Sequence, residues 1–144
     1  LEVGRSLVVA VNKWDGMSSE AREEMKRQLD RRIEFVDFAE TRYISALHGT
    51  GVGELFGAID DAHRSAYIEV QTSDLTELLY RALEAHNPPL VNGRRIKLRY
   101  AHMGGKNPPT IIIHGNQTEH VPDSYRRYLA SFYRKALRLI GTPV

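Results

Sequence analysis

The pattern of apolar and polar positions changes character near residue 70. Before that point, residues 6–12 (SLVVAVN) form an apolar run with almost no alternation, which is typical of a strand covered on both faces. Helical spacing follows Ser18 and Ser19, residues 41–47 (TRYISAL) predict a second short strand, and residues 52–67 predict another helix. Strand, helix, strand and helix with short connections predict a parallel α/β arrangement.

The predicted first half is too small to form a stable sheet alone. Two strands are fewer than a stable sheet needs, so we expect the rest of this sheet to lie before residue 1. Apolar residues at helical spacing should form the buried stripe of each helix. We expect that stripe to contain Met25, Leu29 and Ile33 in the first helix, and Leu55, Ile59 and Ala62 in the second.

A different pattern begins after residue 70. A helix is expected from Ser73 or Asp74 to about residue 86. Residues 94–101 (RRIKLRYA) then alternate basic and apolar positions, and residues 110–115 predict the partner strand of an antiparallel hairpin. A last helix should run from about residue 122 to 140, and a further strand could begin at residue 141. We therefore predict an α/β part at residues 1–70, followed at residues 71–144 by an α+β domain whose small, mostly antiparallel sheet packs on helices.

The alternation also predicts which side chains of the second part face inward. Ile96, Leu98 and Tyr100 should face a core, whereas Arg95, Lys97 and Arg99 should face water or a partner. In the last helix, a second stripe is expected inward because its helical spacing explains it without stacked bases. That stripe contains Tyr125, Tyr128, Leu129, Phe132, Ala136 and Ile140.

Composition narrows the class of protein. The 144 residues contain no cysteine, which excludes disulfides, thiolate catalysis and Cys-based zinc sites, and no apolar run is long enough to span a bilayer. We expect a cytoplasmic protein without membrane contact, and a chain that is a piece of something longer. Residues 71–144 hold 11 Lys and Arg against 5 Asp and Glu, whereas residues 1–70 hold 9 against 13. A basic second half is compatible with a nucleic-acid surface, and also with an ordinary solvated domain.

The polar end of the first strand is the clearest chemical signal. The run NKWD places Asn12, Lys13 and Asp15 just beyond a buried strand, where open α/β sheets bind ligands. One carboxylate can accept two N–H donors, and guanine presents such a pair at N1 and its exocyclic amine. The asparagine amide can donate to acceptor atoms of the base, and the lysine stem can cover its plane. The alternative, without any ligand, is a strand end followed by an Asp-Gly turn.

These residues match NKxD, the guanine-specificity motif of P-loop GTPases, which they resemble. The run SAL, at Ser45, Ala46 and Leu47, ends the next predicted strand, where such GTPases carry their second guanine element. The resemblance implies that the backbone N–H of Ala46 donates to guanine O6. Order, spacing and position at strand ends agree for the two motifs.

The rest of a GTPase site is not in this sequence. It has no GxxxxGK[ST] phosphate loop and no DxxG, the motifs that hold phosphates and Mg²⁺. We expect no catalytic residue in this chain and no GTP hydrolysis by it alone. GTP or GDP, with Mg²⁺, should bind the longer parent through residues that precede this chain, and no ligand is expected on the chain alone.

The second half resembles a particular domain over essentially its whole length. The stretch from PPLVNGRRIKLRYAHMGG to SFYRKALRLIGTP is similar to the C-terminal KH-like domain of the tandem GTPases called Der or EngA. NKWD, SAL and this domain occur in that family's order. The resemblance implies a bacterial GTPase required for assembly of the large ribosomal subunit. It also implies that the KH-like domain contacts ribosomal RNA and the GTPase domains of its own chain.

The RNA-contacting residues are less clearly indicated. KH modules grip a nucleic-acid backbone with a GxxG loop between two helices, and none occurs there in this sequence. A basic set is the candidate RNA contact, although a solvated sheet face explains its strand residues equally well and a rigid turn explains its loop lysine better. The set contains Arg94, Arg95, Lys97, Arg99 and Lys106.

Three other functional interpretations compete with these. His102, His114 and His120 have neither metal-ligand spacing nor arranged acidic partners, so we expect no metal site. The KH-like domain could instead be a regulatory scaffold that binds mainly the GTPase domains. A free-standing nucleic-acid-binding fragment with a vestigial NKWD is disfavoured, because NKWD and SAL agree in order, spacing and position at strand ends. A basic face free of packing contacts would favour RNA, and one buried against residues 1–70 would favour the scaffold.

Overall fold

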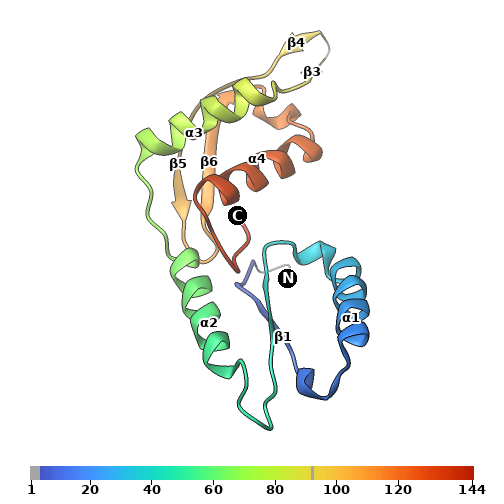
Figure 1. Cartoon of the computed structure of the whole chain (residues 1–144). Helices are drawn as coiled ribbons and strands as arrows, with labels where there is room; N and C mark the ends of the chain where they lie inside the picture. Colours follow the sequence, from blue (N-terminus) through green and yellow to red (C-terminus); the bar gives the residue numbers. More distant parts are fainter. Residues whose placement is uncertain (1–3, 92) are drawn as a thin grey trace.

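The computed structural model describes residues 4–91 and 93–144, which form two packed units (Figure 1). The first unit contains β1, α1, β2 and α2, and the second contains α3, the strands β3 to β6 and α4. The strands are β1 (Val8–Val11), β2 (Glu40–Tyr43), β3 (Leu90–Val91), β4 (Arg94–Arg95), β5 (Lys97–Gly105) and β6 (Thr110–Asn116). The α-helices are α1 (Ser19–Arg32), α2 (Val52–Ala66), α3 (Thr72–Ala85) and α4 (Asp123–Ala136). No helix of the described residues is long and apolar enough to cross a bilayer.

The first unit has the predicted parallel pairing. β1 and β2 lie side by side, with Val8 opposite Glu40 and Val11 opposite Tyr43. α1 makes the crossover between them and begins where the sequence predicted, because the Ser18 hydroxyl accepts a hydrogen bond from the N–H of Ala21 at 3.3 Å. The carboxyl ends of both strands therefore meet at one edge of the sheet.

The buried faces of the first two helices differ from the prediction. α1 buries no residue within the described structure, and Met25 is 38% exposed. α2 packs through its small residues Ala58, Ala62 and Ala66, whereas Ile59 is 45% exposed. The expected inward position of Ile59 is wrong, because Ile59 lines a hollow beside β1 that none of the described residues fills, whereas Ala62 lies against the C-terminal segment.

The second unit is an antiparallel hairpin packed on helices. β5 pairs with β6 as predicted, and α3 and α4 pack against each other over the same core. α3 begins at Thr72 after Gln71, slightly earlier than Ser73 or Asp74 predicted. The short β3–β4 hairpin extends away from the first unit (Figure 1). Fully buried members of this core include Leu75, Leu79, Ala82 and Ala101, together with the nearly enclosed Tyr133.

A bulge in β5 reverses the predicted orientation of Tyr100. Leu98 lies opposite Gly115 and Tyr100 lies opposite His114, so Arg99 is an extra residue on its strand. Ile96 and Leu98 are buried as predicted, but the alternation then shifts by one position. Ala101 is fully buried and Tyr100 is 44% exposed, so the predicted inward position of Tyr100 is wrong.

The last helix also ends earlier than predicted. Arg138 has a left-handed backbone (φ 53°), and the N–H of Leu139 donates to the carbonyl of Arg134 at 2.9 Å. This pattern closes a helix and reverses the chain, so Leu139 turns inward while Ile140 is 40% exposed. Ala136 is exposed as well, and the expected inward positions of Ala136 and Ile140 are wrong.

The C-terminal segment joins the two units. Gly141 accepts a hydrogen bond from the N–H of Leu7 at 2.7 Å and donates one to the carbonyl of Phe38 at 2.9 Å. Its left-handed backbone (φ 67°) and its close approach to Ala62 both require glycine, because an added Cβ would lie 2.6 Å from the Ala62 Cβ. No strand forms at residues 141–144, and the segment serves instead as the connection between the units.

Candidate functional site

The two motifs singled out by the sequence lie together at the carboxyl edge of the β1–β2 sheet. Asn12 and Lys13 follow β1, the short helix η1 (Trp14–Gly16) holds Asp15, and Ser45 follows β2. The side chains surround a shallow hollow of about 280 Å³. It is lined by Asn12, Lys13, Asp15, Gly16, Ser45 and Leu47. Its size is near the lower limit for small-molecule sites.

Asn12 connects the two loops. Its Oδ1 accepts the N–H of Lys13 at 2.8 Å and the N–H of Ala46 at 3.0 Å, across 34 residues of sequence. Because the oxygen of this amide accepts both bonds, its NH₂ group remains available to donate to a ligand. Ala46 does not line the hollow, and its N–H, which the sequence assigned to a ligand oxygen, is bonded here to Asn12.

Trp14 holds the loop that carries Asp15. Its backbone N–H donates to the carbonyl of Ile44 at 3.1 Å, and the centre of its ring lies 4.2 Å from that of Tyr43. The guanidinium of Arg22 lies over the same indole, 5.6 Å from its centre. These contacts attach the loop to β2 and α1. Lys13 adopts a left-handed backbone (φ 64°), which turns the chain between β1 and η1.

Asp15 is an ionised acceptor at the rim of the hollow. A hydrogen bond from the Ser45 hydroxyl, and next the bonds of its own backbone, hold the pKa of Asp15 below its usual 3.8, with smaller contributions from His48 and Arg22. His48 Nε2 lies 3.2 Å from Asp15 Oδ2. The position of His48 just past SAL left it either in the wall of this loop or in solvent, and the structure places it beside Asp15.

Leu47 forms an apolar wall of the hollow. It is 87% exposed, although it is a large aliphatic side chain at the rim of a polar site. Such a side chain can cover one face of a planar ligand, while Asp15 and Asn12 contact its edge. The arrangement can therefore bind a flat, polar-edged molecule.

Four of the five candidate RNA contacts lie together in the second unit. Arg94 and Arg95 are in β4, and Lys97 and Arg99 are in β5. All four are exposed, and within residues 4–91 and 93–144 no carboxylate forms an ion pair with them. No hydrogen bond of the described residues joins their side chains to the first unit.

Lys106 has a different environment from the other four. It pairs with Glu69, and the N–H of the adjacent Asn107 donates to the carbonyl of Ala66 at 2.8 Å. Asn107 Nδ2 also donates to the hydroxyl of Tyr67 at 3.1 Å. The loop between β5 and β6 therefore packs against the end of α2 and the segment after it.

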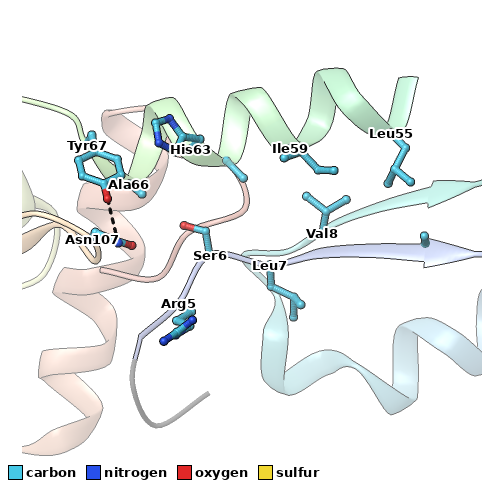
Figure 2. A pocket seen from close by; sticks show the side chains of 12 residues that line it. Arg5, Ser6, Leu7, Val8, Leu55, Ile59, His63, Ala66, Tyr67 and Asn107 are labelled. Atoms are coloured by element: carbon cyan, nitrogen blue, oxygen red, sulfur yellow. Dashed lines mark hydrogen bonds between the residues drawn. The ribbon is translucent and has the colours of Figure 1, made fainter. Parts of the chain in front are cut away.

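A larger hollow of about 520 Å³ lies between β1 and α2 (Figure 2). Its walls are mainly apolar, with Val8, Leu55 and Ile59 facing one another. No Asp or Glu lines it. The hydroxyl of Ser6, on the same wall, is buried without a hydrogen-bond partner in the described structure. This hollow resembles an uncovered packing surface more than a catalytic site.

Two of the three histidines considered as metal ligands meet across the hairpin. His102 Nε2 and His114 Nε2 are 3.0 Å apart. Sequence spacing missed this pair because the two residues approach only when β5 and β6 are paired. Among the described residues, no group of three or more potential ligands could hold a metal ion.

Comparison with known proteins identifies the family. A family model described as the KH-domain-like C-terminal region of EngA bacterial GTPase enzymes matches residues 69–144, so the second unit is a KH-like domain. Curated relatives named GTPase Der, from Thioalkalivibrio sulfidiphilus and Vibrio cholerae, are each 58% identical over all 144 residues. A GTPase Der from Glaesserella parasuis is 56% identical over the same length. The chain belongs to the EngA family, and it spans 31%, 29% and 29% of the lengths of these three relatives.

Proposed function

We propose that this chain supplies the guanine-reading elements and the RNA-contacting domain of a GTPase that acts in assembly of the large ribosomal subunit. Residues 1–70 are, in this proposal, the end of a P-loop GTPase domain. The hydrogen bond from Ala46 to Asn12 Oδ1 carries the proposal, because it joins the NKxD and SAL motifs into one site. The relatives named GTPase Der, each 58% identical over the 144 residues that hold both motifs and the KH-like domain, support it.

The hollow at this site matches the chemistry of a guanine base. The ionised carboxylate of Asp15 can accept from N1–H and from the exocyclic amine, while the Asn12 NH₂ donates to an acceptor of the ring. The exposed Leu47 side chain and the stem of Lys13 can cover its faces. The N–H of Ala46 reaches guanine O6 if the base shares or replaces its bond to Asn12.

Hydrolysis of GTP requires groups outside this chain. A phosphate loop and a DxxG motif would hold the phosphates and Mg²⁺, and the sequence contains neither. The enzyme of the proposal is therefore the longer protein. Further strands of its GTPase domain would pack on the apolar hollow between β1 and α2 (Figure 2), where Val8 and Ile59 lie uncovered.

The exposed basic residues support an RNA partner over the scaffold. Arg94, Arg95, Lys97 and Arg99 are not buried against residues 1–70, so their charge is available to phosphates. The scaffold interpretation has a specific observation of its own, since Lys106 and Gly141 contact the first unit. We propose that the second unit uses the junction for its own chain and the basic face for ribosomal RNA, in the cytoplasm.

Co-sedimentation tests the proposed partner. The 144-residue chain is mixed with purified large or small ribosomal subunits and pelleted over a range of salt concentrations. The proposal predicts that the chain pellets with large subunits, and that this binding weakens as salt increases. Equal recovery with both subunits, or none with the large one, would contradict it.

A further inference from the structure

Three side-chain rings stand together on the β5–β6 hairpin. Tyr100 and His114 lie opposite each other, with ring centres 4.4 Å apart and planes at 8°. His102 lies 5.1 Å from His114 with planes at 21°. We call Tyr100, His102 and His114 the ring cluster. The bulge at Arg99 creates it, because it turns Tyr100 out of the core and onto the face of His114.

We propose that the ring cluster is a stacking platform for unpaired RNA bases. The inference rests on the proposed RNA function and adds the mode of contact. Unpaired bases expose flat faces that stack on aromatic rings and imidazoles, whereas a duplex hides them. His114 lies between Tyr100 and His102 in this stack, and Tyr100 is an end ring that is 44% exposed, so an unpaired base can continue the stack on its outer face.

Hydrogen bonds hold the imidazoles in place. His102 Nδ1 lies 2.9 Å from the carbonyl of Met103, and a carbonyl can only accept, so Nδ1 carries the proton. In the neutral ring, His102 Nε2 is then an acceptor, and His114 Nε2–H donates to it across 3.0 Å. Both rings are thus oriented before any ligand arrives, which lowers the entropy cost of binding.

The face around the cluster is open. Beside the cluster, Ile112 is 40% exposed, and its side chain lies over Gly104, where an added Cβ would come within 2.5 Å of it. Alternate residues of the same strands face the core formed with α3 and α4, namely Ala101, Met103, Ile111 and Ile113. The helices therefore cover the opposite face of the hairpin, and 44% of Tyr100 remains exposed on this one.

Charge favours a nucleic acid as the occupant. Residues 94–118 contain no Asp or Glu, but five Lys and Arg. Lys97 and Arg99 precede Tyr100 in the same strand and are exposed. A single strand can place its bases on the rings while its phosphates approach these cations, and this combination is typical of single-strand binding surfaces. An apolar protein partner would leave those charges without a counterpart.

Binding of short RNA probes tests the platform. The chain is titrated with a fluorescent single-stranded RNA and with a duplex of the same length, using anisotropy. A second single strand contains 2-aminopurine, whose emission reports stacking. Tyr100→Ala should weaken single-strand binding about tenfold, abolish the 2-aminopurine response and leave duplex binding unchanged. Tyr100→Phe should behave as the unmodified chain, and so should Phe56→Ala, which removes an exposed ring from α2.

Thermal unfolding of each variant keeps the test independent of folding, and Tyr100→Leu supplies a ring-free variant of similar bulk if the alanine variant is unstable. Folded Tyr100→Ala or Tyr100→Leu with unchanged single-strand affinity would overturn the platform and leave this face to a protein partner. If Lys97→Ala with Arg99→Ala still weakens both probes in that case, the RNA function stands without the platform. A chain that binds neither probe would remove the RNA function and this inference together.

Discussion

The side-chain oxygen of Asn12 accepts the backbone N–H of Ala46 at 3.0 Å, and this bond connects the loops that follow β1 and β2. The same oxygen also accepts the N–H of Lys13. One amide therefore fixes the spacing between the first polar residue of NKWD and the SAL loop. The proposed guanine site depends on this spacing, because its two halves come from different strands.

Removing the Asn12 amide should loosen the SAL loop. In Asn12→Ala, the N–H groups of Lys13 and Ala46 lose their common acceptor, and we expect a loss of stability of about 1 kcal/mol. Hydrogen exchange measured by NMR should show faster exchange at Ala46. Asn116→Ala removes an exposed side-chain amide from the end of β6, and it should leave the exchange rate of the Ala46 N–H unchanged. Unaltered exchange at Ala46 in Asn12→Ala would show that Asn12 does not hold the loop.

Replacing Ser45 should change the titration of Asp15. The Ser45 hydroxyl is the largest cause that lowers the pKa of this carboxyl, so Ser45→Ala should move it back toward 3.8. Because the folded-state pKa lies below that of the unfolded chain, ionised Asp15 stabilises the fold at higher pH. That contribution is lost as the pH falls through the folded-state pKa, and the loss should begin at higher pH in Ser45→Ala.

Carboxyl-detected NMR titration measures this change directly. Ser124→Ala, which removes an exposed hydroxyl from the first turn of α4, is the matched control and should not alter the titration of Asp15. If the Asp15 curve is the same in Ser45→Ala as in the unmodified chain, the hydroxyl does not stabilise the carboxylate.

Gly141 should be essential to the junction between the units. In Gly141→Ala, the left-handed backbone and the approach to the Ala62 Cβ both oppose a side chain, and we expect a loss of stability of about 2 kcal/mol or more. Gly57→Ala is the control, because nothing lies within 4 Å of its added Cβ in α2 and alanine favours a helix. That control should gain about 0.5–1 kcal/mol. Denaturant unfolding measures both, and equal stability of the two variants would refute the assigned role of Gly141.

Loss of the exposed basic residues should weaken binding to the large subunit. The combined substitutions Arg95→Ala, Lys97→Ala and Arg99→Ala should lower the slope of log affinity against log salt by about 0.7–0.9 for each phosphate that these side chains no longer neutralise. A variant that removes three arginines from α1, at Arg27, Arg31 and Arg32, has the same change in net charge. In co-sedimentation, the variant of Arg95, Lys97 and Arg99 should bind the large subunit more weakly than the α1 variant does. Equally weakened binding in both variants would mean that overall charge, and not this face, attracts the subunit.

Local signals in the sequence predicted much of the candidate site, and pairing between distant strands decided the rest. Asn12, Asp15 and Ser45 were found because the runs NKWD and SAL each lie at the end of a predicted strand, and parallel strands end at the same edge. The outward turn of Tyr100 could not be found in this way, since the bulge at Arg99 appears only in the register with β6. The contact of His102 with His114 depends on the same register.

Helix ends and helix faces show the same division. The start of α1 follows from the local cap at Ser18, and it was predicted. The end of α4 depends on the left-handed backbone of Arg138, a residue type that does not signal a stop. The exposure of Ile59 depends on the hollow between β1 and α2, which none of the described residues fills and which no local pattern indicates.

The most direct measurement is the nucleotide selectivity of Asp15→Asn in the longer GTPase of the proposal. Losing two charge-assisted hydrogen bonds should weaken GDP and GTP on the order of 100-fold, and the new amide should favour xanthine nucleotides, which present an oxygen in place of the exocyclic amine. Equilibrium titration with GDP and with xanthosine diphosphate (XDP) therefore measures which base the Asp15→Asn variant prefers. A reversed preference, toward XDP, is the predicted result, and an unchanged preference for GDP would contradict the assignment of Asp15 and the guanine site built around it.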